Sequence, residues 1–463
     1  MSAQLAELFP YLALTAGGLA VLGAGMLPAG PPRGLLPAMA AFFALLPGLW
    51  ALWPESPGSG IACYFAGLLS AVTVATIGLL ARYADRRGFG GDALYGLLLW
   101  SALGMLVLSA ATDWIMLLLG LELASLCLYA LAAARVRDSL GAEAALKYFL
   151  PGAMALAVLV FGASLIYAGS GSLDLADSLA GGGLTVTAGL ALALVGLGFK
   201  LSLAPVHLWT PDTCQGAPAP VAAFLSTGSK TAAAAALLHL CAEATPEIRE
   251  LLWPALLFTA GLTMAVGNIG ALCQKSVKRL LAYSSIAQMG YVAMAALAVD
   301  EGGGEAALFY LAAYALMDLG AFGAVGALSG QTADRDDIAA YQGLGYVHPW
   351  RAGVLAVSLL SLAGLPPTAG FIGKFLVFGA ALRGGYTALA VFGICMAVIG
   401  IVYALRVVAA LYMREAGQAH PAVPVPAGPF GGLALWAVAA GIMLLGLFPG
   451  PLLAAIARLA GGA

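Results

Sequence analysis

The sequence predicts an all-α, polytopic membrane protein with about fourteen transmembrane helices. Two observations lead to this fold class. First, the 463 residues are 62% hydrophobic and only 9% charged, and the mean hydropathy is +0.97, which is more apolar surface than a soluble core can bury. Second, the apolar residues fall in runs of about twenty, the length that an α-helix needs to cross a bilayer.

The runs follow one another along the chain with short polar loops between them. Runs this long form helices, because only helices and closed barrels satisfy every backbone group in lipid. The longest polar insert, Ser329 to Trp350, has room only for a short interfacial helix, so no soluble domain is expected. The expected spans are 8–27, 34–53, 60–81, 91–111, 113–134, 144–168, 184–206, 218–241, 251–272, 278–298, 305–328, 351–378, 386–412 and 429–449.

The first run is expected to remain as a membrane helix. Glu7 precedes it where a cleavable signal peptide would carry basic residues, and no convincing cleavage site follows.

Charged residues in the loops predict the topology. Basic residues mark the loops that stay on the inner side of a membrane, and here they concentrate in alternate loops. The pattern favours both termini outside, which an even number of helices permits. The expected inner loops hold Arg33, Arg82, Arg86, Arg87, Arg135, Arg137, Lys275, Lys278, Arg279, Arg335, Arg351 and Arg414. The expected outer loops hold Glu55, Asp174, Asp177, Glu243, Glu247, Glu250, Asp300, Glu301 and Glu305, with Arg249 and Arg383 as their main basic residues.

Composition and motifs exclude several classes of function. The formal net charge is −2 and no basic patch is present, so nucleic acid is not an expected partner. The six cysteines are scattered without CxxC spacing, which indicates neither a metal site nor a disulfide framework. No Walker loop, GxGxxG or HExxH motif occurs, and we expect no cofactor, metal or redox site in this chain.

Two pairs of short motifs suggest an internal duplication. LSLAPVHLW at 201–209 is similar to LSLAGLPPTAGF at 360–371, with Ser202 and Ser361 lying 159 positions apart, and Ser125 and Ser285 form a weaker pair 160 positions apart. Copies of five helices would have inverted topologies, because five is odd. Chance similarity is the alternative. The division would be 1–90 with three helices, 91–241 and 251–413 as five-helix units, and 429–463 with a C-terminal helix.

The stretch from Gly196 to Lys230 places charge where lipid is expected. Lys200 and Lys230 are flanked by apolar residues, and a charge near the bilayer centre costs several kcal/mol unless it has a partner or a function. Pro205 lacks a backbone donor and predicts a break in the seventh run. His207 follows the break and suits proton transfer, on the same face as Lys200 if the helix resumes. Snorkelling lysines and a hydrogen-bonded structural histidine are the alternatives.

Two further ionisable residues lie inside apolar runs. Glu122 shares one helix face with Ser125 and Tyr129, at i+3 and i+7. Lys374 follows two prolines in SLAGLPPTAGFIGKF, which predict a break in the twelfth run. A line of protonatable groups without a cofactor is typical of an ion or proton path, whereas a static salt bridge is the alternative for Glu122.

Three residues are weaker candidates for such a path. Lys147 follows Glu143 at i+4, so a local ion pair is a serious alternative. Asp318 is a buried acid with Tyr314 at i−4. His239 has little context, and a structural role is favoured there.

The motifs around these residues resemble a known family. GLELASLCLYALAA, EAALKYFLPGA, GLGFKLSLAPVHLWTPDTCQGAPAPVAAFLSTGSK, KSVKRLLAYSSIAQMGYV and SLAGLPPTAGFIGKF are similar to segments of the antiporter-like membrane subunits of respiratory complex I. The resemblance covers the fourth to the thirteenth run. These subunits are similar in turn to membrane subunits of multisubunit cation/proton antiporters.

The resemblance implies fourteen helices with two inverted five-helix repeats, each holding a broken helix. The family has several subunit types, of which one looks to carry glutamate at the position of Lys374 and another has a lateral helix after the fourteenth helix. Lysine at 374 argues against the first type, and the chain's end soon after the fourteenth run argues against the second. At the position of Asp318 the family would have a neutral polar residue, so the resemblance does not specify which groups form the second half of the proton path. The path residues implied by the motifs are Glu122, Lys200, His207, Lys230 and Lys374.

The resemblance also implies a setting for the chain. It would be a multi-pass protein of the bacterial inner membrane, with periplasmic termini. Its partners would be lipid and the other membrane-arm subunits of the complex, both antiporter-like and small, while other subunits would bind the quinone.

The expected function is proton translocation without redox chemistry in this chain. Redox events elsewhere would shift a Glu122–Lys200 pair in direct contact, and Lys200 would then release its proton through water towards Lys230 and Lys374. A cation/proton antiporter subunit without electron transfer is one alternative, and a structural spacer is another.

Overall fold

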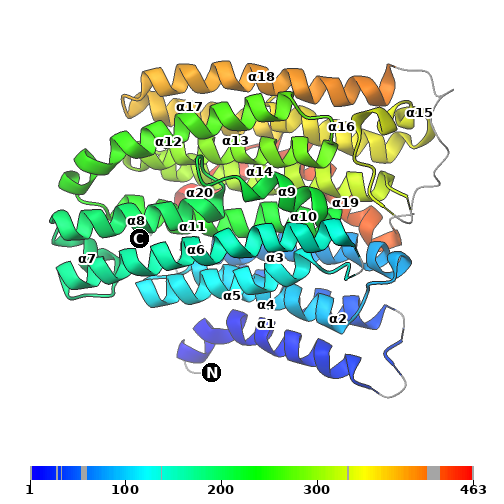
Figure 1. Cartoon of the computed structure of the whole chain (residues 1–463), viewed down its shortest axis with the longest axis horizontal. Helices are drawn as coiled ribbons and strands as arrows, with labels where there is room; N and C mark the ends of the chain where they lie inside the picture. Colours follow the sequence, from blue (N-terminus) through cyan, green and yellow to red (C-terminus); the bar gives the residue numbers. More distant parts are fainter. Residues whose placement is uncertain are drawn as a thin grey trace.

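The computed structural model of the chain describes residues 3–27, 30–32, 34–53, 60–136, 138–330, 333–413 and 428–460. The regular elements of these residues are helices, most of them long and aligned along one common direction (Figure 1). In the described part, 12 helical spans are long and apolar enough to cross a membrane. Together with α2 and the α16–α17 pair they match every expected run, so the predicted all-α membrane fold is confirmed.

The helices follow the expected order along the chain. The N-terminal and first central group is α1 (Ala3–Gly25), α2 (Leu35–Ala51), α3 (Gly60–Arg87), α4 (Asp92–Ser109), α5 (Trp114–Ala132), α6 (Ser139–Ser170), α7 (Leu175–Ala180), α8 (Leu184–Leu201), α9 (Trp209–Gly216), α10 (Ala219–Phe224), the π-helix η1 (Leu225–Ser229) and α11 (Lys230–Glu243). The second group is α12 (Pro246–Leu272), α13 (Val277–Leu297), η2 (Val299–Glu301), α14 (Gly303–Leu328), η3 (Ile338–Tyr341), α15 (Leu344–Val347), α16 (Pro349–Ala363), α17 (Ala369–Arg383) and α18 (Thr387–Tyr412).

The C-terminal region holds more than the single helix expected for 429–463. Its described residues form α19 (Gly428–Leu447) and then α20 (Gly450–Ala460). The prolines at 449 and 451 in FPGPLL separate the two helices, because proline cannot continue the hydrogen-bonding pattern of the preceding helix.

Burial increases steeply from the periphery to the centre of the bundle. The most apolar part of the α10–α11 span is 100% buried, and the corresponding parts of α13 and α14 are each 94% buried, whereas that of α19 is only 22% buried. Polar side chains on the three central spans are therefore shielded from lipid by the rest of the chain.

Both predicted breaks are confirmed, and they share one local geometry. The residue directly after α8, Ser202, has a left-handed backbone (φ 61°), and so does Gly364 directly after α16 (φ 87°). A cis proline follows each of these residues by three positions, at Pro205 and Pro367. Glycine adopts a left-handed backbone without strain, which suits the position after α16. After α8 the same conformation falls on a serine, and the Ser202 hydroxyl accepts a hydrogen bond from Thr210 Oγ1 at 2.7 Å.

A second local feature recurs at nearly the same spacing. Asp113 caps α5 and bridges to Asp174 before α7, while Ser276 caps α13 and bridges to Asp337 before η3. The members of each pair lie 163 positions from their counterparts. Helix α7 lies at the left end of the bundle and α15, just after η3, at the right end (Figure 1).

This spacing corrects the register expected from the serines. Gly104 packs against Ala124 so closely that a Cβ would meet backbone, and Gly267 packs in the same way against Ala287, also 163 positions later. Ser285 lies 163 positions after Glu122, in the spacing of these recurring contacts, so the match of Ser125 with Ser285 differs from that spacing by three residues. Short serine motifs carry too little information to fix a helical register.

Loops assigned to one side of the membrane meet in space. Arg249 pairs with Asp300, and Arg383 donates to the Glu301 carbonyl at 2.9 and 3.1 Å, all in the expected outer group. Arg87 and Lys278, from the expected inner group, share one partner. Four loop residues used in the topology prediction lie outside the described residues: Arg33, Glu55, Arg137 and Arg414.

Candidate functional site

Lys200 is the first ionisable group of the candidate path, in the last turn of α8. Its side chain is buried (2% exposed). Nζ donates to Ser125 Oγ at 2.8 Å and to the Tyr148 hydroxyl at 2.7 Å, and it lies 5.1 Å from the Tyr148 ring centroid and 5.8 Å from that of Tyr129. Two hydroxyls and two aromatic rings therefore replace water around this ammonium group.

Glu122 lies on α5 one turn before Ser125 and is half-buried. The expected direct contact with Lys200 is wrong, since no ion pair of Glu122 occurs among the described residues and the Ser125 and Tyr148 hydroxyls accept the hydrogen bonds of the lysine instead. The carboxylate still acts electrostatically on Lys200 across this gap. Glu122 and Lys200 therefore interact electrostatically without forming an ion pair.

The break after α8 positions His207 differently from the helical expectation. The chain turns between Ser202 and Leu208 before α9 begins, so His207 has no helical register with Lys200. Its side chain is largely buried, and Nδ1 has no hydrogen-bond partner in the described structure. Trp209 holds the turn in place, because its Nε1 donates to the Phe199 carbonyl at 2.9 Å and its ring stacks on Tyr148.

Lys230 lies in the centre of the bundle and is 0% exposed. It is the first residue of α11 and directly follows the π-helix η1, whose wider turn is typical of functional positions in helices. Nζ donates to Ser285 Oγ on α13 at 2.6 Å. Cys214 and Asp318 are the titratable groups that interact with it most strongly.

Lys374 lies in the second turn of α17, just after the second break. Nζ donates to the carbonyls of Leu362 and Ala363 at 2.8 and 3.1 Å, which the end of α16 leaves without helical partners. The ammonium also lies 5.0 Å from the ring centroid of Tyr291. No acid forms an ion pair with Lys374 in the described part of the chain.

A polar face of α13 connects the surroundings of Lys230 and Lys374. Ser285 contacts Lys230, and its neighbour Ser284 accepts from Gln288 Nε2 at 3.4 Å. The same Nε2 donates at 3.2 Å to the Leu362 carbonyl that Lys374 uses. Sequence reasoning missed Gln288, although the i, i+4 spacing of Ser284 and Gln288 indicated one helix face.

Two of the weaker candidates contact acids away from the core. Lys147 has a 48% exposed side chain and contacts Glu143 at 2.7 Å and Asp212 at 2.9 Å, so the expected local pair forms and gains a second acid. His239 Nε2 lies 3.7 Å from Glu243 on a half-exposed surface of α11. Neither residue contacts the three buried lysines through a hydrogen bond in the described structure.

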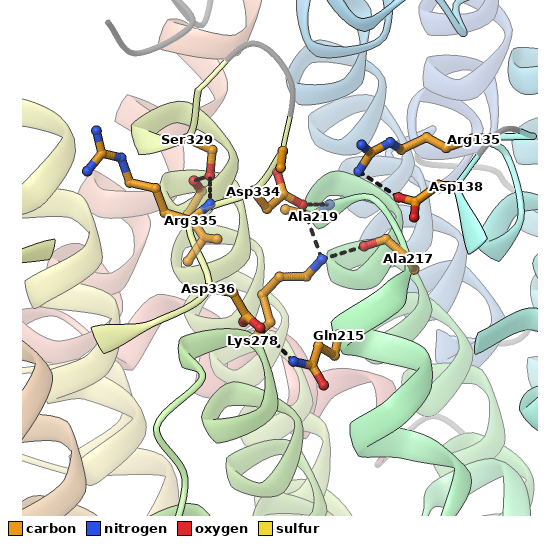
Figure 2. A network of polar contacts seen from close by, with 12 residues as sticks. Arg135, Asp138, Gln215, Ala217, Ala219, Lys278, Ser329, Asp334, Arg335 and Asp336 are labelled. Atoms are coloured by element: carbon orange, nitrogen blue, oxygen red, sulfur yellow. Dashed lines mark hydrogen bonds and ion pairs between the residues drawn. The ribbon is translucent and has the colours of Figure 1, made fainter. Parts of the chain in front are cut away.

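A buried ion cluster at one end of the bundle escaped the sequence analysis. The Asp334 side chain is 5% exposed and lies 2.7 Å from Arg87 and 3.1 Å from Lys278. Lys278 also donates to the Ala217 carbonyl at 2.6 Å, and the Ala219 amide donates to Asp334 at 3.2 Å (Figure 2). The cluster fixes the junction of α9 and α10; Arg87 and Lys278 had been used only for topology, and Asp334 had not been singled out.

The stability contributed by Asp334 is expected to depend on pH. Burial alone would raise the pKa of Asp334, but the positive charges of Lys278 and Arg87 outweigh it and lower the pKa to about 2. Because this lies below the unfolded value, the contribution is complete above about pH 4 and is lost as the pH falls towards 2. The shift corresponds to about 2 kcal/mol.

The measurement is the Tm of the solubilised protein between pH 6 and 2. Asp334→Asn should start from a lower Tm and lose less of it across this window than the wild type does. Asp177→Asn, at an exposed acid of α7, is the control and should follow the wild-type curve. An equal acid-induced loss of Tm in wild type and Asp334→Asn would contradict the prediction.

Comparison with known proteins identifies the family. The family model described as "NADH:quinone oxidoreductase/Mrp antiporter, TM" matches residues 111–400, more than half of the chain. The chain belongs to the NADH:quinone oxidoreductase/Mrp antiporter family. The resemblance seen in the sequence motifs is thus confirmed, and all eight candidate residues lie inside the matched region of this family member.

Relatives within the family are similar over the whole chain. NADH-quinone oxidoreductase subunit N 1 of Solidesulfovibrio magneticus is 72% identical over 463 residues, covering 100% of both chains. A chain of respiratory complex I from Thermus thermophilus is 35% identical, with a TM-score of 0.82 over 96% of this chain and 99% of that one. A chain of the Mrp complex from Dietzia shares the fold, with a TM-score of 0.84 at 21% identity over 100% and 98% of the two chains.

Proposed function

We propose that the chain is a proton-translocating membrane-arm subunit of a quinone-reducing complex of the complex I type. The observation that carries the proposal is the series of three buried lysines, Lys200, Lys230 and Lys374, each bonded to neutral oxygen groups in place of an acid. Buried ionisable groups inside membrane spans are rare and mark ion or proton pathways. The names of the similar subunits support this assignment.

The proposal divides the chain into two related halves. We assign 91–241 and 251–413 to inverted five-helix repeats, flanked by 1–90 and 429–463. The recurring breaks at Ser202 and Gly364 support this division, as does the placement of each break lysine against a tyrosine, Tyr148 for Lys200 and Tyr291 for Lys374. Each half would supply one half of the path, with Lys230 between them.

Transfer would begin at the coupled pair of Glu122 and Lys200. Charges act over longer distances in a low-dielectric interior than in water, so a change at Glu122 shifts the proton affinity of Lys200 without direct contact. Lys200 would then release its proton past His207, whose Nδ1 is free to accept a hydrogen bond, towards Lys230. Lys374 would receive the proton next, through groups along α13 and water.

The same proposal specifies what other proteins would supply. The chain would carry no redox site and no cofactor of its own, and other subunits would bind the electron donor and the quinone. Its partners would be the remaining membrane-arm subunits and lipid, in a bacterial inner membrane with both termini on the periplasmic side. The loop charges support this orientation.

The alternative is a cation/proton antiporter subunit of a multisubunit exchanger. The likeness to the Dietzia Mrp chain favours it, although at 21% identity that likeness concerns the fold alone. Two measurements separate the candidates: sodium-dependent transport without electron transfer would support the exchanger, and redox subunits in the purified complex, identified by mass spectrometry, would support the proposal.

Lys200→Met provides the test of the proposed path. Methionine keeps the volume but cannot carry a proton, so pumping per electron pair, measured in vesicles with the assembled complex, is expected to fall about tenfold or more, as losing a positioned proton-transfer group commonly costs ~100-fold. Lys275→Met, at an exposed loop lysine, is the control and should pump normally. Undiminished pumping by Lys200→Met at normal electron transfer would refute the role of Lys200.

A further inference from the structure

Asp318 is a buried acid that the proposed path leaves unused. It lies on α14 and is 0% exposed. Oδ2 accepts a hydrogen bond from Ser226 Oγ, whereas Oδ1 has no partner in the described structure. A carboxylate with an unsatisfied oxygen is costly in such a position, and it is stable there only with a positive charge or a proton close by.

Lys230 can supply Asp318 with either a positive charge or a proton. Ser226, which binds the Asp318 carboxylate, belongs to η1 and precedes Lys230 by four residues. The lysine and the acid interact electrostatically but form no direct ion pair, because Lys230 Nζ donates to Ser285 Oγ at 2.6 Å. The two groups therefore interact without a direct contact.

Tyr314 brings a further hydroxyl to the residue that binds Asp318. Tyr314 lies four residues before Asp318 on α14, is wholly buried and donates to the Ser226 carbonyl at 3.0 Å. Its hydroxyl also interacts with Ser285 and with the Asp318 carboxylate. The hydroxyls of Ser285, Tyr314 and Ser226 therefore gather around Lys230 and Asp318, and in this conformation Ser285 and Tyr314 donate to the backbone carbonyls of Ala282 and Ser226.

We propose that Asp318 is the proton-exchange partner of Lys230, reached through the hydroxyls of Ser285 and Tyr314. The inference rests on the proposed function, in which Lys230 carries the proton in the middle of the path. Lys230 gives a proton to Ser285, Ser285 passes its own to Tyr314, and Tyr314 passes its own to Asp318. The ammonium and carboxylate become an amine and a carboxylic acid, both hydroxyls are restored, and no other reactant is needed.

This arrangement gives the central lysine an acid within its own chain. Glu122 acts on Lys200 from a half-exposed position on α5, whereas Asp318 acts on Lys230 from the most buried part of the bundle. His207 and Cys214 are the other titratable groups that interact with Lys230, and neither is joined to it by a hydrogen bond in the described structure. Asp318 is the member of this group that has buried hydroxyls beside both itself and Lys230.

Asp318→Asn and Tyr314→Phe test the exchange in the assembled complex. The first removes the proton acceptor and keeps its shape, and the second keeps both charges and removes one hydroxyl. Pumping per electron pair in vesicles is expected to fall by about tenfold or more in each, the scale set by losing one proton-transfer group. Asp318→Glu should recover much of the pumping, because it restores a carboxyl group.

Tyr341→Phe is the matched control, since Tyr341 is also wholly buried and donates its hydroxyl to a backbone carbonyl, that of Arg335, at 2.8 Å. It should assemble and pump normally. If Asp318→Asn fails to assemble, Tyr314→Phe decides the question, because it leaves every charge in place.

Three outcomes would overturn the exchange or the function beneath it. Normal pumping by Asp318→Asn and Tyr314→Phe, with pumping lost in Lys230→Met, would refute the exchange and leave the proposed function intact. Loss of pumping in Asp318→Asn alone would make Asp318 a fixed counter-charge and refute the exchange. Normal pumping by Lys230→Met would refute the proposed function itself.

Discussion

Lys230→Met is expected to abolish proton translocation by this subunit while the complex still assembles. Lys230 is the sole lysine of the α10–α11 span, whose most apolar part is fully buried, and every proton passing between the two halves would reside on it. Methionine has nearly the same length and is apolar, so it fills the site at little cost in packing. The expected loss in pumping per electron pair is about a hundredfold, within the range for removing a proton-transfer group.

Lys230→Arg separates proton exchange from a static charge at the same position. Arginine keeps the positive charge but is not deprotonated in proteins. If Lys230 exchanges protons, both variants fail to pump. If a fixed charge is all that is needed, Lys230→Arg pumps normally and the exchange role is refuted.

Gly370→Ala is expected to destabilise the protein and to displace Lys374. Gly370 lies in the first turn of α17, and its amide donates to Ser361 Oγ at 3.1 Å. A Cβ there would lie 2.8 Å from the Ser361 carbonyl carbon and from Met317 Sδ, and closer still to the Ser361 oxygen. Backbone cannot yield as a flexible side chain does, so α17 must move, at a cost of about 3 kcal/mol.

The displacement should also impair function, because Lys374 lies four residues after Gly370 on the same face of α17. Its two bonds to the Leu362 and Ala363 carbonyls depend on the close approach of α17 to the end of α16. Thermal stability of the solubilised complex and pumping in vesicles are the two measurements, and both should fall.

Gly353→Ala, on the neighbouring α16, is the matched control. A Cβ at Gly353 meets nothing within 4 Å, so alanine should be neutral or slightly stabilising in this helix. Equal Tm values for Gly370→Ala and Gly353→Ala would show that the helix junction is less tightly fixed than its contacts imply.

The helices were predictable because lipid imposes a strict requirement on the chain. Each span must satisfy its own backbone, so the apolar runs alone located the fourteen segments. Pro205 and Pro367 located the breaks, because proline removes a backbone donor. The π-helix at Leu225–Ser229 could not be predicted in this way, since an α-turn and a π-turn bury the same apolar side chains.

The residues of the candidate site were predictable, but not their bonds. A buried lysine is conspicuous in an apolar run, which identified Lys200, Lys230 and Lys374. Helical spacing placed Ser125 and Glu122 on one face but could not decide which of them reaches Lys200. The answer depends on Tyr148, which comes from a different helix and shares the ammonium group with Ser125.

The cluster around Asp334 was missed for a related reason. Arg87, Lys278 and Asp334 lie in or near loops, where charged residues also report topology and are usually solvated. Nothing in the sequence shows which loops meet, so their pairing could be found only from the fold.

The π-helix before Lys230 makes the length of its span unusually important. A π-turn is equivalent to one surplus residue inside a helix, so the residues on either side of it are out of phase with an uninterrupted α-helix. Loops tolerate insertions and deletions, but gain or loss of one residue in the α-helical parts of this span would rotate everything beyond it by roughly 100°. Loss of the surplus residue between Leu225 and Ser229 would instead leave an ordinary α-helix with α10 and α11 in the same relative phase. A change in the number of residues is therefore easier to accommodate at the π-turn than elsewhere in this span, where substitutions accumulate more easily during evolution.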